Sequence, residues 1–140
     1  MKNNEMNENT ALSKMDVSVS VTDLRIGNLM EYYIDTDNLG WQIFPIDWQD
    51  IRLCEEQNES FNKYNRPIAI TEELLLKIGS IKLDFKDISS FNLHGTQINF
   101  INGLWIDYAT RVEIKGLHHL QNIFFFRNSE ELQISCLTEH

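Results

Sequence analysis

Two adjacent histidines are the residues of this chain best suited to chemistry. His118 and His119 stand in the stretch KGLHHLQNIFFFRN, just before the amide pair Gln121 and Asn122. On a helix the two imidazoles would point about 100° apart, so they cannot share a metal ion as residues four apart can. We therefore expect no metal site, and favour a polar helix face or a buried, hydrogen-bonded imidazole. The two amides could bind the hydrogen-bonding edge of a ligand, although capping of a neighbouring strand is favoured.

Aromatic and basic side chains upstream of the histidines could form a binding surface. Trp105 and Tyr108 could stack on a base or a sugar, and Arg111 and Lys115 could contact a phosphate. Aromatic residues of a small mixed fold more often belong to the core, and a single arginine more often lies at the surface. The complete candidate set for binding a ligand or a partner is Trp105, Tyr108, Arg111, Lys115, His118, His119, Gln121 and Asn122.

The common catalytic motifs are missing from the sequence. It contains no GxSxG elbow, no GxxxxGK phosphate-binding loop, no HExxH pair and no GxGxxG pattern. We therefore favour a non-enzymatic binding protein that needs no cofactor. The alternative is a small hydrolase for a nucleotide-like substrate, in which His118 or His119 works with Asp107 as general acid and base.

The charge of the chain disfavours some classes of partner. Lys and Arg number 12 against 21 Asp and Glu, which gives a formal net charge of -9. This excess repels the phosphates of nucleic acids and anionic membrane surfaces. No apolar run approaches the roughly 20 residues that cross a bilayer, and the opening MKNNEMNENT lacks the apolar core of a signal peptide. We expect a cytoplasmic protein with free thiols at Cys54 and Cys136.

The first half of the chain predicts a polar tail followed by a β-hairpin. Residues 1–15 are Asn-rich without an apolar period, which is typical of a flexible terminus, and residues 16–140 are expected to form one domain. Alternating valines predict a strand over residues 17–21. The stretches LRIGNLMEYYI and WQIFPI predict two paired strands, the second at a sheet edge because Pro45 donates no ladder hydrogen bond. Between Trp48 and Arg66 the signals weaken, and the stretch EEQNESFNKYNR, residues 55–66, is interpreted as an exposed loop.

The second half predicts two helices and further strands. Thr71 is placed to cap a short helix that Gly79 ends, and a second helix is predicted over residues 117–127. The dipeptide Asn102–Gly103 predicts a type I′ hairpin, and alternation predicts one long strand over residues 104–114, with a bend at Ala109–Thr110 as an option. Together these elements predict an α+β fold with a mainly antiparallel sheet of about five to six strands and two helices.

The phenylalanines of the second predicted helix spread too widely for one buried stripe. Phe124, Phe125 and Phe126 cover about 200° of the helix surface. We expect Phe125 and Phe126 to meet a second element or another subunit, and the protein to be a homo-oligomer. After the helix, the stretch LQISCL predicts a final short strand.

Three stretches between Leu24 and Ile134 carry a family resemblance. They are LRIGNLM, PIAITEELLLKIG and IKGLHHLQNIFFFRNSEELQI, in this order. In them the chain resembles a family of small uncharacterised proteins of bacteriophages and prophages, and the closing stretch is the most specific. The chain departs from the family pattern at His119, where Gln is common, and at residues 127–129, where the family has a turn of small residues and Gly. The resemblance transfers no catalytic residues and implies a phage accessory protein.

The resemblance and the missing motifs together define the expected function. We expect a binding protein that acts in the cytoplasm of the host and either inhibits a host protein or sequesters a small, nucleotide-derived defence signal. Beside the hydrolase, a component of the virion or of the packaging machinery remains an alternative.

Overall fold

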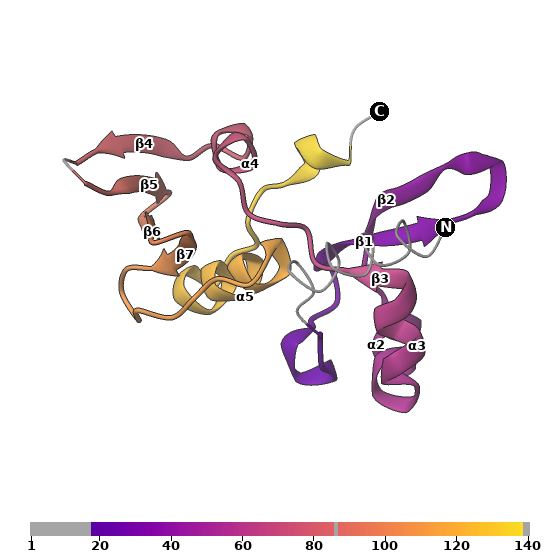
Figure 1. The fold of residues 1–140 in the computed structure, drawn as a ribbon. Coiled ribbons are helices and arrows are strands. Elements are labelled where there is room, and N and C mark those ends of the chain that lie inside the picture. Colours follow the sequence, from indigo (N-terminus) through magenta and orange to yellow (C-terminus); the bar gives the residue numbers. More distant parts are fainter. Residues whose placement is uncertain (1–17, 86, 139–140) are drawn as a thin grey trace. The chain divides into compact units, whose positions relative to one another are not determined.

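The computed structural model of the chain describes residues 18–85 and 87–138. The predicted tail, residues 1–15, lies outside the described residues. The chain divides into two compact units, Met1–Ala69 and Ile70–His140. Each unit contains helices and an antiparallel sheet, so the predicted α+β class is confirmed, with the strands divided between two sheets (Figure 1).

The first unit contains a three-stranded antiparallel sheet in the order β2-β1-β3. Its strands are β1 (Leu29–Ile34), β2 (Gly40–Pro45) and β3 (Asn65–Arg66). The register of β1 and β2 begins with Leu29 opposite Pro45 and ends with Ile34 opposite Gly40, which confirms the predicted hairpin. β2 lies at an edge of the sheet, as expected for a strand that ends in proline.

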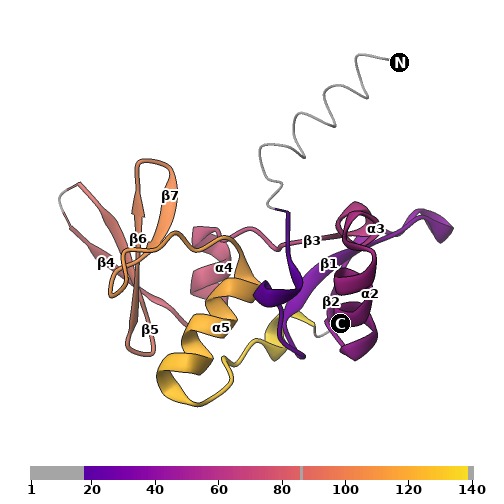
Figure 2. The same cartoon turned by 90° about the horizontal axis from the view of Figure 1, so that it is seen from below.

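Two helices lie between Trp48 and Tyr64, and they include most of residues 55–66, which we predicted to be an exposed loop. They are α2 (Trp48–Glu56) and α3 (Asn58–Tyr64), which pack side by side (Figure 2). The loop prediction was wrong because residues 55–64 are mainly polar and contain only two apolar side chains, Phe61 and Tyr64, so no apolar period marks α3. One residue of each helix is fully buried, Cys54 in α2 and Phe61 in α3, and the partly buried Ile51 and Leu53 of α2 also pack against the core.

The core of the first unit gathers residues from distant parts of the unit. Val19, Met30, Ile46, Cys54 and Phe61 form one cluster, and none of them is more than 4% exposed. The thiol of Cys54 is free, as predicted. The cluster therefore joins β1, α2 and α3 with the segments around Val19 and Ile46.

The segment around Val19 does not form the predicted strand. Val17 lies outside the described residues, and Val21–Asp23 forms a 3₁₀ turn. The backbone of Val19 forms hydrogen bonds with amide side chains of α3 instead of with a neighbouring strand. Asn62 Oδ1 accepts the Val19 N–H at 2.9 Å, and the Nδ2 atoms of Asn58 and Asn62 donate to the Val19 carbonyl at 2.8 and 3.0 Å. The backbone of Val19 is thus satisfied without a sheet.

The second unit contains a four-stranded antiparallel sheet in the order β4-β5-β6-β7. Its elements are α4 (Glu72–Lys77), β4 (Ile81–Asp84), β5 (Ser89–Leu93), β6 (Thr96–Ile101), β7 (Leu104–Asp107) and α5 (Leu117–Asn128). Two-residue turns at His94–Gly95 and Asn102–Gly103 join β5 to β6 and β6 to β7. All four turn residues have φ between 49° and 96°, as a type I′ turn requires. The second turn confirms the predicted hairpin.

β7 is much shorter than the strand predicted over residues 104–114. It ends at Asp107, whose carboxylate accepts the backbone N–H and the hydroxyl of Thr110 at 3.2 and 2.7 Å. This side-chain bonding stabilises a turn that reverses the chain, after which Glu113 bridges back to Ile106. The alternation in the sequence therefore belongs to two antiparallel pieces and not to one strand.

The two predicted helices of this unit are confirmed, and the predicted final strand is wrong. α5 ends at Asn128 and is followed by Ser129, which has a φ of 57°, and α4 ends before Gly79, which has a φ of 105°. The stretch LQISCL forms no strand, and its last residues make a 3₁₀ turn, Ser135–Leu137. None of the helices in the described part of the chain has the length and apolar character that crossing a membrane requires.

Replacing Thr71 by alanine is expected to lower the free energy of unfolding by about 1 kcal/mol. Thr71 Oγ1 accepts the Leu74 N–H at 3.0 Å, and alanine leaves this donor at the start of α4 without its acceptor. Urea denaturation followed by circular dichroism measures the loss. Thr71→Ser keeps the hydroxyl and should cost much less, so equal losses for the two variants would contradict the capping role.

Candidate functional site

The eight residues predicted to bind a ligand or a partner lie in the second unit. Trp105 packs on Phe91 and Phe100, with ring centroids 5.5 and 4.6 Å apart, and so belongs to the packing of the sheet. Tyr108 and Arg111 are exposed in and just after the turn that follows β7. There the guanidinium of Arg111 lies 4.9 Å from the Tyr108 ring centroid, and its Nε donates to the Tyr108 carbonyl.

α5 positions both histidines and the amide pair. His118 and Gln121 are only 3% and 2% exposed, whereas His119 and Asn122 are half-buried. Nδ1 of His119 accepts the backbone N–H of the exposed Lys115 at 3.1 Å, which fixes the chain just before the helix. Within residues 18–85 and 87–138, no three His, Cys, Asp or Glu side chains gather closely enough to hold a metal ion. This arrangement favours structural roles for the histidines.

Asp107 is a buried carboxylate whose two oxygens are both engaged. Arg127 donates to it through Nη1 and Nη2 at 3.0 and 2.9 Å, and Thr110 adds two further hydrogen bonds. Burial alone would raise the pKa of Asp107, but the bonds from Arg127 and Thr110 outweigh it and lower the pKa. A general base needs an accessible oxygen and a pKa near the working pH, so this geometry disfavours the hydrolase hypothesis.

The two residues predicted at an interface differ in exposure. Phe126 is 80% exposed, while Phe125 is half-buried, and their ring centroids are 6.1 Å apart. Phe126 is therefore the member of the pair that is open to contacts.

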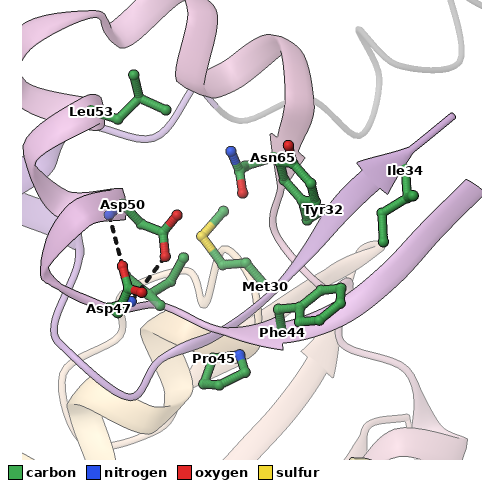
Figure 3. A pocket seen from close by; sticks show the side chains of 10 residues that line it. Met30, Tyr32, Ile34, Phe44, Pro45, Asp47, Asp50, Leu53 and Asn65 are labelled. Atoms are coloured by element: carbon green, nitrogen blue, oxygen red, sulfur yellow. Dashed lines mark hydrogen bonds between the residues drawn. The ribbon is translucent and has the colours of Figure 1, made fainter. Parts of the chain in front are cut away.

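A pocket of about 370 Å³ lies in the first unit, between α2 and the sheet (Figure 3). Met30 and Phe44 are opposite each other on β1 and β2, so their side chains share one face of the sheet with that of Tyr32. The start of α2 provides Asp47 and Asp50 at the other side of the pocket. Figure 3 shows Met30 between these carboxylates and the aromatic rings.

The two carboxylates of the pocket form a reciprocal helix cap. Asp47 Oδ1 accepts the backbone N–H groups of Gln49 and Asp50, and Asp50 Oδ2 accepts the N–H of Asp47 at 3.0 Å. Burial raises the pKa of Asp50, and the neighbouring Asp47 carboxylate also contributes to the rise. Hydrogen bonds from the backbone and side chain of Asp50 lower the pKa of Asp47. Asp50 also lines the pocket, so a cationic ligand in the pocket can contact its side chain.

The opposite wall of the pocket is aromatic. Tyr32 and Phe44 are 42% and 45% exposed, and their rings meet edge to face with centroids 6.4 Å apart. Asn65 is buried beside them and is held by a hydrogen bond from its Nδ2 to the Phe61 carbonyl at 3.0 Å. A carboxylate opposite aromatic rings is a suitable site for an ammonium or a guanidinium group.

A second pocket, of about 530 Å³, lies in the second unit and is also acidic. His94 and Phe124 form one part of it, with ring centroids 6.3 Å apart, and Glu130, Glu131 and Gln133 form the rest. Neither this pocket nor the one in the first unit is lined by lysine or arginine, or by any of the eight predicted binding residues.

The sequence prediction missed the pocket of the first unit entirely. One signal was available, because the spacing of Asp47 and Asp50 is that of a helix cap. No helix was predicted from Trp48, so the element that covers this face of the sheet was missing from the predicted fold. Comparison of the chain with protein-family models, with curated proteins and with solved structures found no match in any of the three.

Proposed function

We propose that this protein is a non-enzymatic binding protein whose first-unit pocket takes a positively charged organic group. The observation that carries the proposal is the Asp50 carboxylate, which lines a pocket together with the exposed rings of Tyr32 and Phe44. A carboxylate pairs with a cation, and aromatic faces attract the same cation. Lysine and arginine side chains of a partner protein share this chemistry with small organic amines.

The electrostatics of the pocket support a cation and oppose an anion. Burial and the nearby Asp47 both disfavour the charged form of Asp50, and a bound cation would offset both effects. The net charge of -9 adds a long-range attraction for cations. A nucleotide phosphate would meet two carboxylates here, and Arg111 and Lys115 lie outside this pocket.

The proposed place of action follows from the resemblance to phage proteins. It is the cytoplasm of a bacterial host, where the protein would inhibit a host factor or hold a small molecule. Of these two roles, the pocket favours a host protein that presents a lysine or an arginine over a nucleotide-derived signal, because the signal would carry phosphates.

Titration with n-butylammonium and with methylguanidinium, followed by two-dimensional NMR, tests the proposal. We expect resonances of Tyr32, Phe44 and Asp50 to shift with both cations, and to shift far less with adenosine monophosphate. Asp50→Asn keeps an oxygen acceptor for the Asp47 N–H but removes the charge, and should weaken cation binding by roughly tenfold.

Two controls make this experiment decisive. Glu55→Gln removes a carboxylate from an exposed position of α2 outside the pocket and should leave binding unchanged. Because the pKa of Asp50 is raised above the ordinary aspartate value of 3.8, binding should begin to weaken above that pH as the solution is acidified. Wild-type protein whose pocket resonances respond to neither cation would contradict the proposal.

A further inference from the structure

β4 is an open edge of the four-stranded sheet. It stands at one end of the strand order, and all four of its residues, Ile81–Asp84, are exposed (Figure 1). An edge strand presents a row of backbone N–H and C=O groups that can pair with another strand. The partner that fits this edge depends on which residues present these groups.

The adjacent hairpin determines the direction of the backbone groups. Across the two-residue turn His94–Gly95, Leu93 and Thr96 are opposite each other and form the hydrogen-bonded pair that closes such a turn. Bonding directions alternate along a strand, so every second residue of β5 counted back from Leu93 bonds to β6. The residues between them, including Ser90, bond to β4.

The outward groups of β4 therefore belong to its two charged residues. Leu83 lies opposite Ser90, so the backbone of Leu83 bonds inward to β5. Its neighbours Lys82 and Asp84 direct their N–H and C=O groups outward. Their side chains lie on the same face of the sheet, because they are two residues apart.

The outward backbone groups and the charges of β4 are complementary to those of the same strand in a second copy that runs antiparallel. With Leu83 opposite the partner's Leu83, Lys82 lies opposite the partner's Asp84, and Asp84 lies opposite the partner's Lys82. Each of these is a pair in which the outward backbone groups can exchange two hydrogen bonds and the side chains carry opposite charges. The next registers that align outward groups place Lys82 opposite itself or Asp84 opposite itself, and like charges disfavour both.

The other face of the same strand adds apolar contacts in this register. Ile81, Leu83 and Phe85 alternate with the charged residues and are 66%, 36% and 57% exposed. The two Leu83 side chains meet at the two-fold axis, where strands without direct hydrogen bonds bring side chains closest. Ile81 lies opposite the partner's Phe85, so both exposed side chains lose contact with water.

We propose that two copies of this protein form a symmetric dimer by antiparallel pairing of their β4 strands, giving one sheet of eight strands, four from each copy. The existing ion pair of Lys82 with Glu72, at 3.1 Å, is compatible with this arrangement, because a lysine ammonium has three donors and can contact two carboxylates. The dimer does not depend on the pocket of the first unit or on its ligand.

Sedimentation velocity of the full chain from about 1 to 300 µM tests the proposal, since a short interface dissociates in this range. We expect a monomer–dimer equilibrium. Lys82→Glu places a carboxylate opposite the partner's Asp84, and Asp84→Lys places an ammonium opposite the partner's Lys82. Each substitution should weaken dimerisation by roughly tenfold or more.

Mixing the two single variants provides the sharpest result. The Lys82→Glu chain carries two negative charges on this edge and the Asp84→Lys chain two positive ones, so they complement each other. An equimolar mixture should form a heterodimer although each variant alone is mainly monomeric. The double variant Lys82→Glu with Asp84→Lys restores complementarity within one chain and should dimerise by itself.

Two further variants distinguish the β4 edge from neighbouring and distant surfaces of the chain. Glu72→Gln removes the neighbour of Lys82 without changing β4 and should leave the dimer intact. Phe126→Ser changes the most exposed phenylalanine of α5 and should also leave it intact. A wild-type chain that stays monomeric throughout, a mixture that fails to associate, or a dimer lost only in Phe126→Ser would overturn the proposal. Thermal unfolding by circular dichroism shows which variants are folded.

Discussion

Replacing Arg127 by methionine is expected to lower the free energy of unfolding by about 3 kcal/mol. The Asp107 side chain has no exposed surface, and the Arg127 side chain is 29% exposed. Methionine fills much of the same space but leaves a buried carboxylate without its countercharge. Thr110 alone then has to stabilise that charge, through the two hydrogen bonds that it already makes. Chemical denaturation monitored by circular dichroism measures the loss.

An exposed ion pair supplies the matched control. Arg52 and Glu56 face each other on α2 with side chains 68% and 49% exposed, so Arg52→Met should cost about 0.5 kcal/mol or less. Adding Asp107→Asn to Arg127→Met removes the buried charge and should recover part of the loss. If Arg127→Met costs no more than Arg52→Met, Arg127 does not provide the countercharge that stabilises the buried Asp107.

The same pair makes stability depend on pH. The pKa of Asp107 is lowered in the folded protein, so the folded state releases this proton more readily than the unfolded state, where the ordinary value is 3.8. The stabilisation is fully present above that value and is lost as the pH falls through the lowered pKa of the folded state. Asp107→Asn removes this contribution, so its stability should fall less steeply than that of the wild type in acid.

Replacing Phe61 by alanine is expected to cost about 4 kcal/mol. The ring is completely buried and contributes the largest side chain to the cluster with Val19, Met30, Ile46 and Cys54. Alanine removes this apolar contact and leaves a cavity that the surrounding elements can fill only in part. Hydrogen exchange measured by mass spectrometry should show the greatest loss of protection in peptides from residues 18–69.

A second substitution in the same helix distinguishes burial from helix propensity. Tyr64 also lies in α3 but is 41% exposed, and Tyr64→Ala should cost about 1 kcal/mol. Similar losses for Phe61→Ala and Tyr64→Ala would mean that the helix, and not the core contact, determines the effect.

Features that depend on neighbouring residues were predictable from the sequence. The turn at Asn102–Gly103 needs positive φ at two adjacent residues, and the cap at Thr71 needs one hydroxyl at the start of a helix. The hairpin of β1 and β2 and the helix α5 follow from alternation and from helical spacing in the same way. In each case the determining contacts lie within a few residues of one another.

Features that depend on distant side chains were not predictable. Val19 lies in a segment that alternates like a strand, but its backbone is satisfied by Asn58 and Asn62, which lie about 40 residues later. The strand predicted through residues 104–114 stops because the Asp107 side chain bonds to the turn that follows it. α3 was missed because its single buried residue, Phe61, makes no visible period.

The candidate site depends even more strongly on side chains that lie far apart in the sequence. The residues singled out by type, above all His118 and Gln121, are buried within the packing of α5. The pocket residues Tyr32, Phe44 and Asp50 form no common motif in the sequence, because each belongs to a different element and only the fold brings them together. Chemistry that depends on a shared cavity leaves no motif in a single chain.

The two sheets also differ in when they can form while the chain is being synthesised. Each strand of the second unit pairs only with its neighbours in sequence, so this sheet can form hairpin by hairpin as it leaves the ribosome. In the first unit, β1 can pair with β3 only after Asn65 and Arg66 have emerged from the ribosome. The Val19 N–H likewise cannot bond to Asn62 until that residue has emerged. The first unit is synthesised first, but its sheet is complete only when residue 66 has emerged. Until then, the edge of β1 that later pairs with β3 is the surface at which a nascent chain is most open to chaperones or to mispairing.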